Sequence, residues 1–240
     1  MLIYAHRGAR GYAPENTMAA FAEALRLKAD GIELDVHLSR DGHVVICHEH
    51  TIDRTSNGHG WIRDLTLKQL KSYDFGSWFD RRYQGQSLVT LSEFMAWFTP
   101  TPLMLNIEIK NGPVIYPRIE EKIIAILQQF NASGRTIVSS FFHPSLSRIK
   151  ELDGTLKTGI LFECRPLNPL QFIRPTKADY LHPCWKSLDA GWCPAALAAG
   201  IGIHAYTVNT KEEYRFTAKM GARAVFTDYP DRFNTHAGPQ

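Results

Sequence analysis

The sequence has little of what marks secreted, membrane-spanning or thiolate-metal proteins. It contains only four cysteines in 240 residues, none in C-x-x-C spacing, so neither a disulfide framework nor a cysteine-built zinc site is expected. No run approaches the roughly 18 to 20 apolar residues of a membrane span, and the first residues lack the segments of a secretory signal. We therefore expect a cytoplasmic protein with reduced thiols and no stable membrane association.

Concentrated charge is also missing. The formal net charge is +3, charged residues make up 21% of the chain, and lysine and arginine are scattered along it. A nucleic-acid partner is therefore not expected, because such binding needs a basic patch or stripe. The scattered cations still suffice for a small-molecule substrate that carries one phosphate.

Two common catalytic motifs are absent as well. Gly8-Ala9-Arg10-Gly11 has the wrong spacing for a turn that holds a nucleotide phosphate, and it does not open a helix. Ser139-Ser140 lacks the G-x-S-x-G setting of a hydrolase nucleophile. A nucleotide cofactor and a serine nucleophile are therefore not predicted.

What the sequence does contain is a regular alternation of short apolar strands and amphipathic helices. Apolar residues recur at helical spacing in 17–28 and in 116–130. A hairpin turn at Asp41-Gly42 leads into a returning strand, 44–48. Without that arm, eight strands remain, each followed by a helix or helical turn: 2–6, 31–36, 103–109, 136–140, 158–162, 180–182, 203–208 and 224–227. This order predicts an α/β fold, the TIM (β/α)8 barrel.

One segment interrupts the alternation. Residues 50–88 are rich in polar residues, glycine and aromatics, so they are too long for a simple loop and too aromatic for disorder. We interpret them as a small subdomain inserted after the second barrel strand and its hairpin arm. Since such barrels often run to about 250 residues as one unit, residues 1–240 are predicted to form a single domain.

Two carboxylates inside one apolar strand are the most informative feature. Glu33 and Asp35 lie two residues apart, so in a strand their side chains point to the same face. Burying like charges is costly unless a partner compensates them. Glu108 ends the next barrel strand, and strand ends meet at one mouth of a barrel. Any one of these acids could form a salt bridge, for instance Glu108 with Lys110, but the three together predict a Ca²⁺ or Mg²⁺ site.

Histidines and cations also stand at the ends of strands. His6 and His48 follow apolar strands beside the carboxylate strand, and imidazole can transfer protons near neutral pH. His182 also ends a strand and is expected only at the rim. Arg7 is suited to phosphate oxygens, and Lys110 supplies a second positive charge. With a metal, these groups indicate phosphoryl chemistry.

These residues, in this order, resemble the glycerophosphodiester phosphodiesterase family, in particular its compact cytoplasmic bacterial members. Each motif is weak alone, but the set is specific and spans most of the chain. The matching motifs are His6-Arg7-Gly8, Pro14-Glu15-Asn16-Thr17, Glu33-Leu34-Asp35-Val36, Asp41-Gly42, Val45-Ile46-Cys47-His48, Asp53-Arg54-Thr55, Asn57-Gly58-x-Gly60, Gly76-Ser77-Trp78-Phe79, Glu108-Ile109-Lys110 and Tyr206-Thr207-Val208-Asn209.

The resemblance implies a fold, an activity and roles for individual residues. The fold is a TIM barrel with a small insertion after the second strand. The activity is hydrolysis of glycerophosphodiesters to sn-glycerol 3-phosphate and an alcohol, through a cyclic phosphate formed by attack of a glycerol hydroxyl. The implied roles are metal binding by Glu33, Asp35 and Glu108, acid–base catalysis by His6 and His48, and substrate or phosphate binding by Arg7, Lys110 and Tyr206.

The chain departs from the family pattern at three positions. Glu49 stands where Asp commonly follows the second histidine, Val89 replaces a Pro, and Tyr206 replaces a Trp. Tyr206 is expected to alter how the glycerol or alcohol packs at the mouth. No departure falls on the acid–base pair or on a metal ligand, so activity is expected to be retained.

Two other functions stay open on the residues alone. One is a related lipid phosphodiesterase of phospholipase D or C type on the same barrel, with Trp78 and Phe79 as membrane-docking residues. The other is a non-catalytic barrel that binds phosphate or glycerol, against which the paired His6 and His48 argue. The alcohol group, the choice between Ca²⁺ and Mg²⁺ and the oligomeric state are left open.

Overall fold

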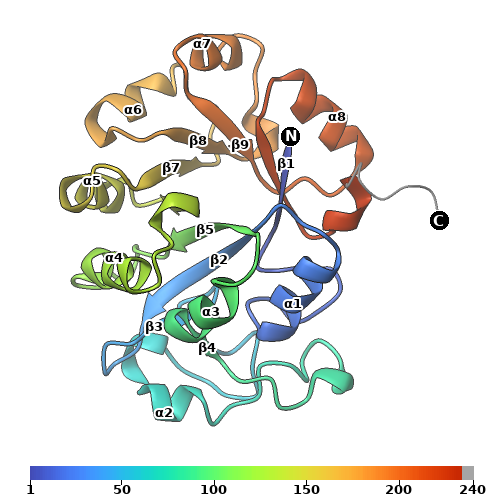
Figure 1. Ribbon diagram of the computed structural model, residues 1–240, viewed down its shortest axis with the longest axis vertical. Helices are drawn as coiled ribbons and strands as arrows, with labels where there is room; N and C mark the ends of the chain where they lie inside the picture. The colour runs from blue at the N-terminus through green and yellow to red at the C-terminus, as the bar shows by residue number, and fades with distance from the viewer. Residues whose placement is uncertain (234–240) are drawn as a thin grey trace.

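Eight parallel strands close into a barrel in the computed structural model, which describes residues 1–233 (Figure 1). Around the ring the order is β1, β2, β5, β6, β7, β8, β9 and β10, and β10 pairs with β1. The bounds are β1 Leu2–Ala5, β2 Gly31–Leu38, β5 Met104–Ile109, β6 Thr136–Ser140, β7 Lys157–Phe162, β8 Tyr180–Pro183, β9 Gly202–Ala205 and β10 Ala224–Thr227. The predicted TIM barrel is confirmed, and its strands are apolar because both faces are buried.

Helices surround the barrel, as Figure 1 shows. They are α1 Met18–Arg26, α3 Leu91–Phe98, α4 Ile119–Gln129, α5 His143–Leu152, α6 Leu170–Thr176, α7 Cys193–Ala198 and α8 Lys211–Lys219, with short turns η3 Ser133–Arg135, η4 Trp185–Ser187 and η5 Pro230–Phe233. The helix predicted over 17–28 begins at Met18, because Thr17 caps it by accepting from the Ala20 amide. The helix predicted over 116–130 begins only at Ile119, because Arg118 has a φ of 62°, outside the helical region.

The insertion predicted after the second strand is present and has a core of its own. Strand β3 (Val44–Ile46) pairs antiparallel with β2, and β4 (Val89–Thr90) pairs antiparallel with β3. Between them lie η1 Ile62–Asp64, α2 Leu67–Leu70 and η2 Arg81–Tyr83. The buried residues of this separate core are Val45, Cys47, Ile52, Ile62, Leu70, Phe75 and Leu88. The returning strand is shorter than the predicted 44–48, so His48 lies two residues beyond its end.

A layer of stacked rings fills the barrel interior. Tyr180 stacks on His204 with centroids 4.4 Å apart, and His204 stacks on His182 at 5.0 Å. Both imidazoles are buried, and neither ring nitrogen of His182 has a hydrogen-bond partner among residues 1–233. Gly159 on β7 leaves room for this layer, since a Cβ there would lie 2.4 Å from the His182 ring. The rim position predicted for His182 is therefore wrong, because its side chain points into the barrel.

All four cysteines are free thiols. Within the described part of the chain, no helix has both the length and the apolar character needed to cross a membrane.

Candidate active site

Three buried carboxylates meet at the carboxyl end of the barrel strands. Glu33 and Asp35 lie on β2, and the strand register sets Asp35 beside Glu108 of β5. One oxygen from each of the three lies within 4.8 Å of the others. The three acids that the sequence predicted to form one site are thus neighbours in space.

The electrostatics of these three carboxylates favour a bound cation. Burial, with the charges of Asp35 and Glu108, raises the pKa of Glu33 well above its usual range. The Glu33 Oε1 atom is buried and has no hydrogen-bond partner among residues 1–233. Burial also raises the pKa of Glu108, although Lys110 opposes this shift. Hard divalent cations bind carboxylate oxygens, so the donor set and its unpartnered oxygen fit such an ion.

Lys110 lies against two of the three acids. Its Nζ is 2.5 Å from Glu108 Oε1 and 2.9 Å from Asp35 Oδ1. Although burial disfavours the ammonium form, these two carboxylates raise the Lys110 pKa, so the side chain stays charged. Burial likewise opposes ionisation of Asp35, but Lys110, with His48 and Arg7, holds its pKa well below the usual range.

Arg7 is held in an unusual backbone conformation at the end of β1. Its φ is 54°, a region that residues other than glycine seldom adopt, and its backbone N–H donates to Glu33 Oε2 at 2.8 Å. Its guanidinium donates from Nη1 to Glu15 at 2.9 Å, while Nε lies 3.6 Å from Asp35. This Nε is buried and has no hydrogen-bond partner among residues 1–233, so its contact with Asp35 is an ion pair without a hydrogen bond.

His6 is oriented by a carboxylate from the far end of the chain. Its Nδ1 lies 2.7 Å from Asp228 Oδ1, which follows β10. A carboxylate accepts and does not donate, so Nδ1 carries the proton and Nε2 is left as an acceptor. Burial lowers the pKa of His6 to about 4 despite the opposing effect of Asp228, so the ring is neutral at neutral pH. Asp228 itself accepts from Asn209 Nδ2 at 2.9 Å.

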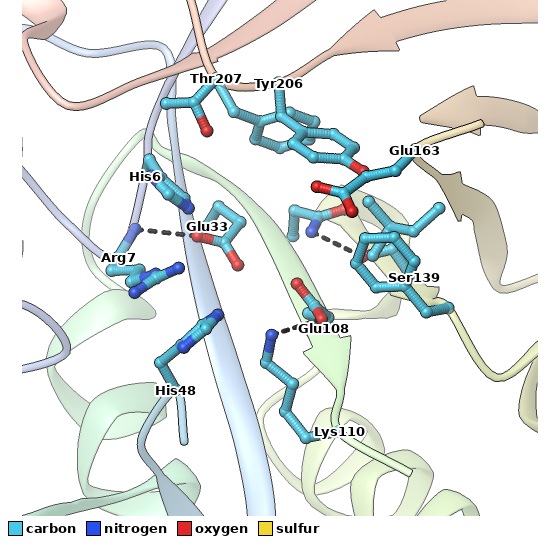
Figure 2. A pocket seen from close by; sticks show the side chains of 14 residues that line it. His6, Arg7, Glu33, His48, Glu108, Lys110, Ser139, Glu163, Tyr206 and Thr207 are labelled. Carbon is cyan, nitrogen blue, oxygen red and sulfur yellow. Dashed lines mark hydrogen bonds and ion pairs between the residues drawn. The ribbon is translucent and has the colours of Figure 1, made fainter. Parts of the chain in front are cut away.

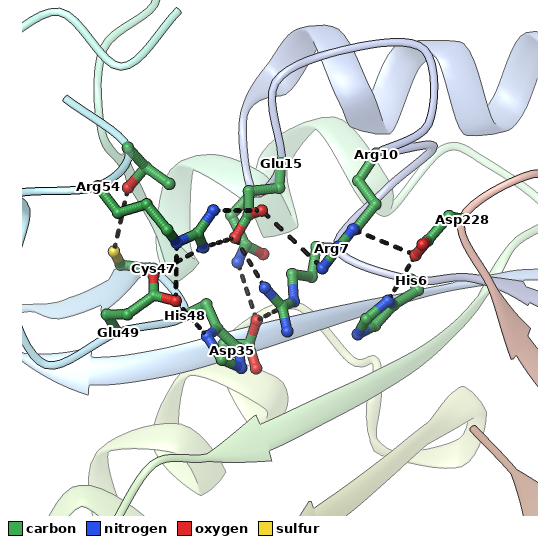
Figure 3. A network of polar contacts seen from close by, with 12 residues as sticks. His6, Arg7, Arg10, Glu15, Asp35, Cys47, His48, Glu49, Arg54 and Asp228 are labelled. Atoms are coloured by element: carbon green, nitrogen blue, oxygen red, sulfur yellow. Dashed lines mark hydrogen bonds and ion pairs between the residues drawn. The ribbon is translucent and has the colours of Figure 1, made fainter. Parts of the chain in front are cut away.

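His48 has a matching carboxylate, which a second arginine holds. Its Nδ1 lies 2.9 Å from Glu49 Oε1. Arg54, from the insertion, donates to Glu49 at 2.9 Å and 2.7 Å and also to Glu15 at 3.0 Å and 2.5 Å. Burial works against ionisation of Glu49, but His48 and Arg54 lower its pKa to about 2. Figure 3 shows the resulting chain of contacts from Arg7 through Glu15, Arg54 and Glu49 to His48.

These groups line a pocket of about 310 Å³ at the barrel mouth, seen in Figure 2. Its lining residues are His6, Arg7, Glu33, His48, Asn106, Glu108, Lys110, Ser139, Phe141, Leu161, Glu163, Tyr206, Thr207 and Phe226. All predicted site residues except Asp35 line it, and Asp35 lies directly behind. The Tyr206 hydroxyl donates to the Phe162 carbonyl at 3.0 Å, so this residue presents its ring to the pocket.

Sequence reasoning missed several residues that contact the predicted ones. Asp228 received no role, because its partner His6 lies 222 positions away. Glu15 and Arg54 stood inside matching motifs but received no role. Glu49 was noted as a departure from the family, although its position next to His48 was itself the signal.

Comparison with known proteins gives one consistent result. The family model described as "Glycerophosphoryl diester phosphodiesterase family" matches residues 6–232. A glycerophosphodiester phosphodiesterase of Caldanaerobacter subterraneus subsp. tengcongensis is 39% identical over 230 residues, covering 96% of this chain and 95% of that protein. One from Bacillus subtilis is 35% identical and covers 98% of this chain and 85% of the relative.

A solved structure extends this similarity to three dimensions. The phosphodiesterase of Oleispira antarctica, solved in complex with the product sn-glycerol-3-phosphate, has a TM-score of 0.87 and 30% identity. The match covers 97% of this chain and 94% of that one. A glycerophosphodiester phosphodiesterase from Agrobacterium tumefaciens has a TM-score of 0.85 and 27% identity, with 97% and 98% covered.

Proposed function

We propose a metal-dependent reaction in which His6 and His48 move the protons. The premise of this proposal is that the chain belongs to the glycerophosphoryl diester phosphodiesterase family and is an enzyme of that family. The substrate is a glycerophosphodiester, and the products are sn-glycerol 3-phosphate and an alcohol. The observation that carries the proposal is a cluster of three buried carboxylates beside two histidines, each histidine oriented by its own carboxylate. The related Oleispira enzyme binds sn-glycerol-3-phosphate, which supports the same product here.

Glu33, Asp35 and Glu108 would hold the divalent cation, Ca²⁺ or Mg²⁺. The unpartnered Oε1 of Glu33 and its raised pKa support this assignment, because a cation would stabilise the ionised carboxylate. When bound, such an ion polarises a phosphoryl oxygen as a Lewis acid.

Arg7 and Lys110 bind the phosphate oxygens in this proposal. Both cations line the pocket, and Arg7 is buried while Lys110 is largely so. Charge-assisted hydrogen bonds from fixed cations stabilise the charge that builds up on phosphate oxygens during substitution at phosphorus.

His6 and His48 act as the acid–base pair. One imidazole removes the proton of a glycerol hydroxyl as that oxygen bonds to phosphorus, and the other protonates the alcohol oxygen as its bond to phosphorus breaks. Water then opens the cyclic phosphate with the two roles exchanged. The neutral state of His6 and its free Nε2 support a proton-accepting role.

Hydrolysis of glycerophosphocholine, with and without a chelator, tests the proposal. Activity should be lost with chelator and return with Ca²⁺ or Mg²⁺, and His6→Ala or His48→Ala should lose about 10²- to 10⁴-fold in kcat. The matched control is His59→Ala, an exposed histidine of the insertion that pairs with Asp53. Full activity after metal removal would reject the metal role, and wild-type activity in His6→Ala would reject the acid–base role.

The alternatives left open by the sequence gain nothing from the described residues. The relatives are named as glycerophosphodiester phosphodiesterases, which argues against a non-catalytic barrel. Trp78, the expected membrane-docking residue of a lipid phosphodiesterase, is 38% exposed, but its indole N–H donates to the Phe75 carbonyl at 2.9 Å and its ring packs against Phe79.

A further inference from the structure

Part of the pocket wall takes no part in the proposed proton transfer or metal binding. Glu163 follows β7, Phe141 follows β6 and Tyr206 follows β9, and all three line the pocket. In the ring of eight strands, β7 stands opposite β1, which carries His6 and Arg7. Figure 2 shows Glu163 across the pocket from Arg7 and His48. Arg7, which we assign to the phosphate, and Glu163 therefore lie on opposite sides of the site.

The Glu163 carboxylate is a negative charge without a partner. Within residues 1–233 its side chain forms no ion pair and no hydrogen bond, although its backbone carbonyl accepts from Ser187 Oγ at 2.6 Å. The nearby cations are directed elsewhere, since Arg165 donates to the Lys186 carbonyl and Lys186 lies over Trp185. A carboxylate in a pocket for a phosphate anion is unfavourable unless the substrate also carries a positive group.

Two aromatic rings stand beside this carboxylate. Phe141 and Tyr206 have centroids 6.0 Å apart and planes at 85°. The hydrogen bond from the Tyr206 hydroxyl to Phe162 fixes one ring, while Phe141 is 46% exposed and faces the mouth. Ring faces attract ammonium groups through the aromatic quadrupole, and a carboxylate adds direct charge attraction.

We propose that Glu163, Phe141 and Tyr206 form a subsite for a cationic alcohol, so that this enzyme favours glycerophosphodiesters with an ammonium or quaternary ammonium group. The inference rests on the proposed function and names its substrate class. A zwitterionic substrate presents an anion to Arg7 and Lys110 and a cation to Glu163. Its charge separation matches that of the pocket.

A substrate pair that differs in the charge of the alcohol tests the subsite. The holoenzyme is assayed with glycerophosphocholine and with glycerophosphoglycerol, and the ratio of their kcat/KM values is compared between wild type and Glu163→Gln. We expect this ratio to fall by about three- to tenfold, mainly through KM for the choline substrate, as expected for a solvent-exposed charge pair. Phe141→Leu should lower the ratio in the same direction. The control is Glu212→Gln, an exposed glutamate of α8 that pairs with Arg215.

An unchanged ratio in both Glu163→Gln and Phe141→Leu overturns the subsite, even where overall activity falls. A binding measurement keeps this test separate from the proposed reaction. In His6→Ala, calorimetry compares the Kd of the two substrates with and without Glu163→Gln. A preference for glycerophosphocholine that depends on Glu163 supports the subsite whether or not turnover occurs. Equal Kd values for the two substrates reject it.

Discussion

The carboxylate of Asp228 decides which ring nitrogen of His6 carries the proton, and Asp228→Asn tests that role. Oδ1 accepts from His6 Nδ1 at 2.7 Å, and Oδ2 accepts from Asn209 Nδ2 at 2.9 Å. Asn209 cannot reverse its amide, because its Oδ1 already accepts from the Asp228 backbone N–H at 2.9 Å. With Asn209 donating at the place of Oδ2, the new amide oxygen lies there and the NH₂ group faces His6, although Arg10 Nε, 3.2 Å from Oδ1, opposes this orientation.

A neutral imidazole that accepts at Nδ1 carries its proton on Nε2, which can then no longer accept one. The ring stays neutral in the variant, since burial already lowers the His6 pKa to about 4 and Asp228 is a group that raises it. We expect kcat to fall by about 10²- to 10⁴-fold, the usual contribution of an acid–base group. KM should change little, because Arg7 and Lys110 are untouched.

The assay is steady-state hydrolysis of glycerophosphocholine by the metal-loaded enzyme, with ¹⁵N NMR of the imidazole as an independent readout of the tautomer. Asp231→Asn is the matched control, because among residues 1–233 this aspartate accepts hydrogen bonds only from the Tyr12 hydroxyl, at 2.9 Å and 3.0 Å. A kcat near that of wild type, with the His6 proton still on Nδ1, would refute the reasoning. So would a loss confined to KM.

Three further outcomes follow from the same electrostatics. Arg54→Met should lower kcat by about 10- to 100-fold, because Glu49 loses the cation that holds it against His48. Arg63→Met is the control, and equal kcat values for the two variants would contradict this expectation. In chelator at neutral pH, Glu33→Gln should have a higher Tm than the wild type, because ionisation of an acid with a raised pKa opposes folding. A lower Tm would contradict the assignment of Glu33 to the cation. His204→Phe should make the free energy of unfolding less sensitive to acid. Burial lowers the His204 pKa to about 3, so in the wild type this free energy falls as pH drops from 6.5 toward that value. Urea titrations across this range would show an unchanged pH dependence if the argument fails.

The barrel was predictable because parallel strands buried on both faces leave a clear apolar record in the sequence. Helix boundaries were harder to predict, since the spacing of apolar residues does not reveal the left-handed conformation of Arg118. The place of His182 depended on whether its side chain points inward or to the rim, which the two-residue period of a strand does not decide alone.

The candidate site divides in the same way. Glu33 and Asp35 were predictable as a pair, because residues two apart share a strand face. Their contact with Glu108 depends on the register of β2 against β5, which is a tertiary property. Asp228 follows β10, which lies beside β1 only because the barrel closes, and Glu163 follows β7 on the opposite side of the ring, so only the closed barrel reveals what they face.

Arg54 belongs to the insertion, yet it holds both Glu15 beside β1 and Glu49 beside His48. The insertion has its own small core, separate from the large core between the barrel and its helices. Units with few buried apolar contacts open before the rest of a protein. On heating, this enzyme should therefore lose activity before its barrel unfolds. Partial opening of the insertion would release His48 from its carboxylate, and catalysis would cease while the barrel is still folded.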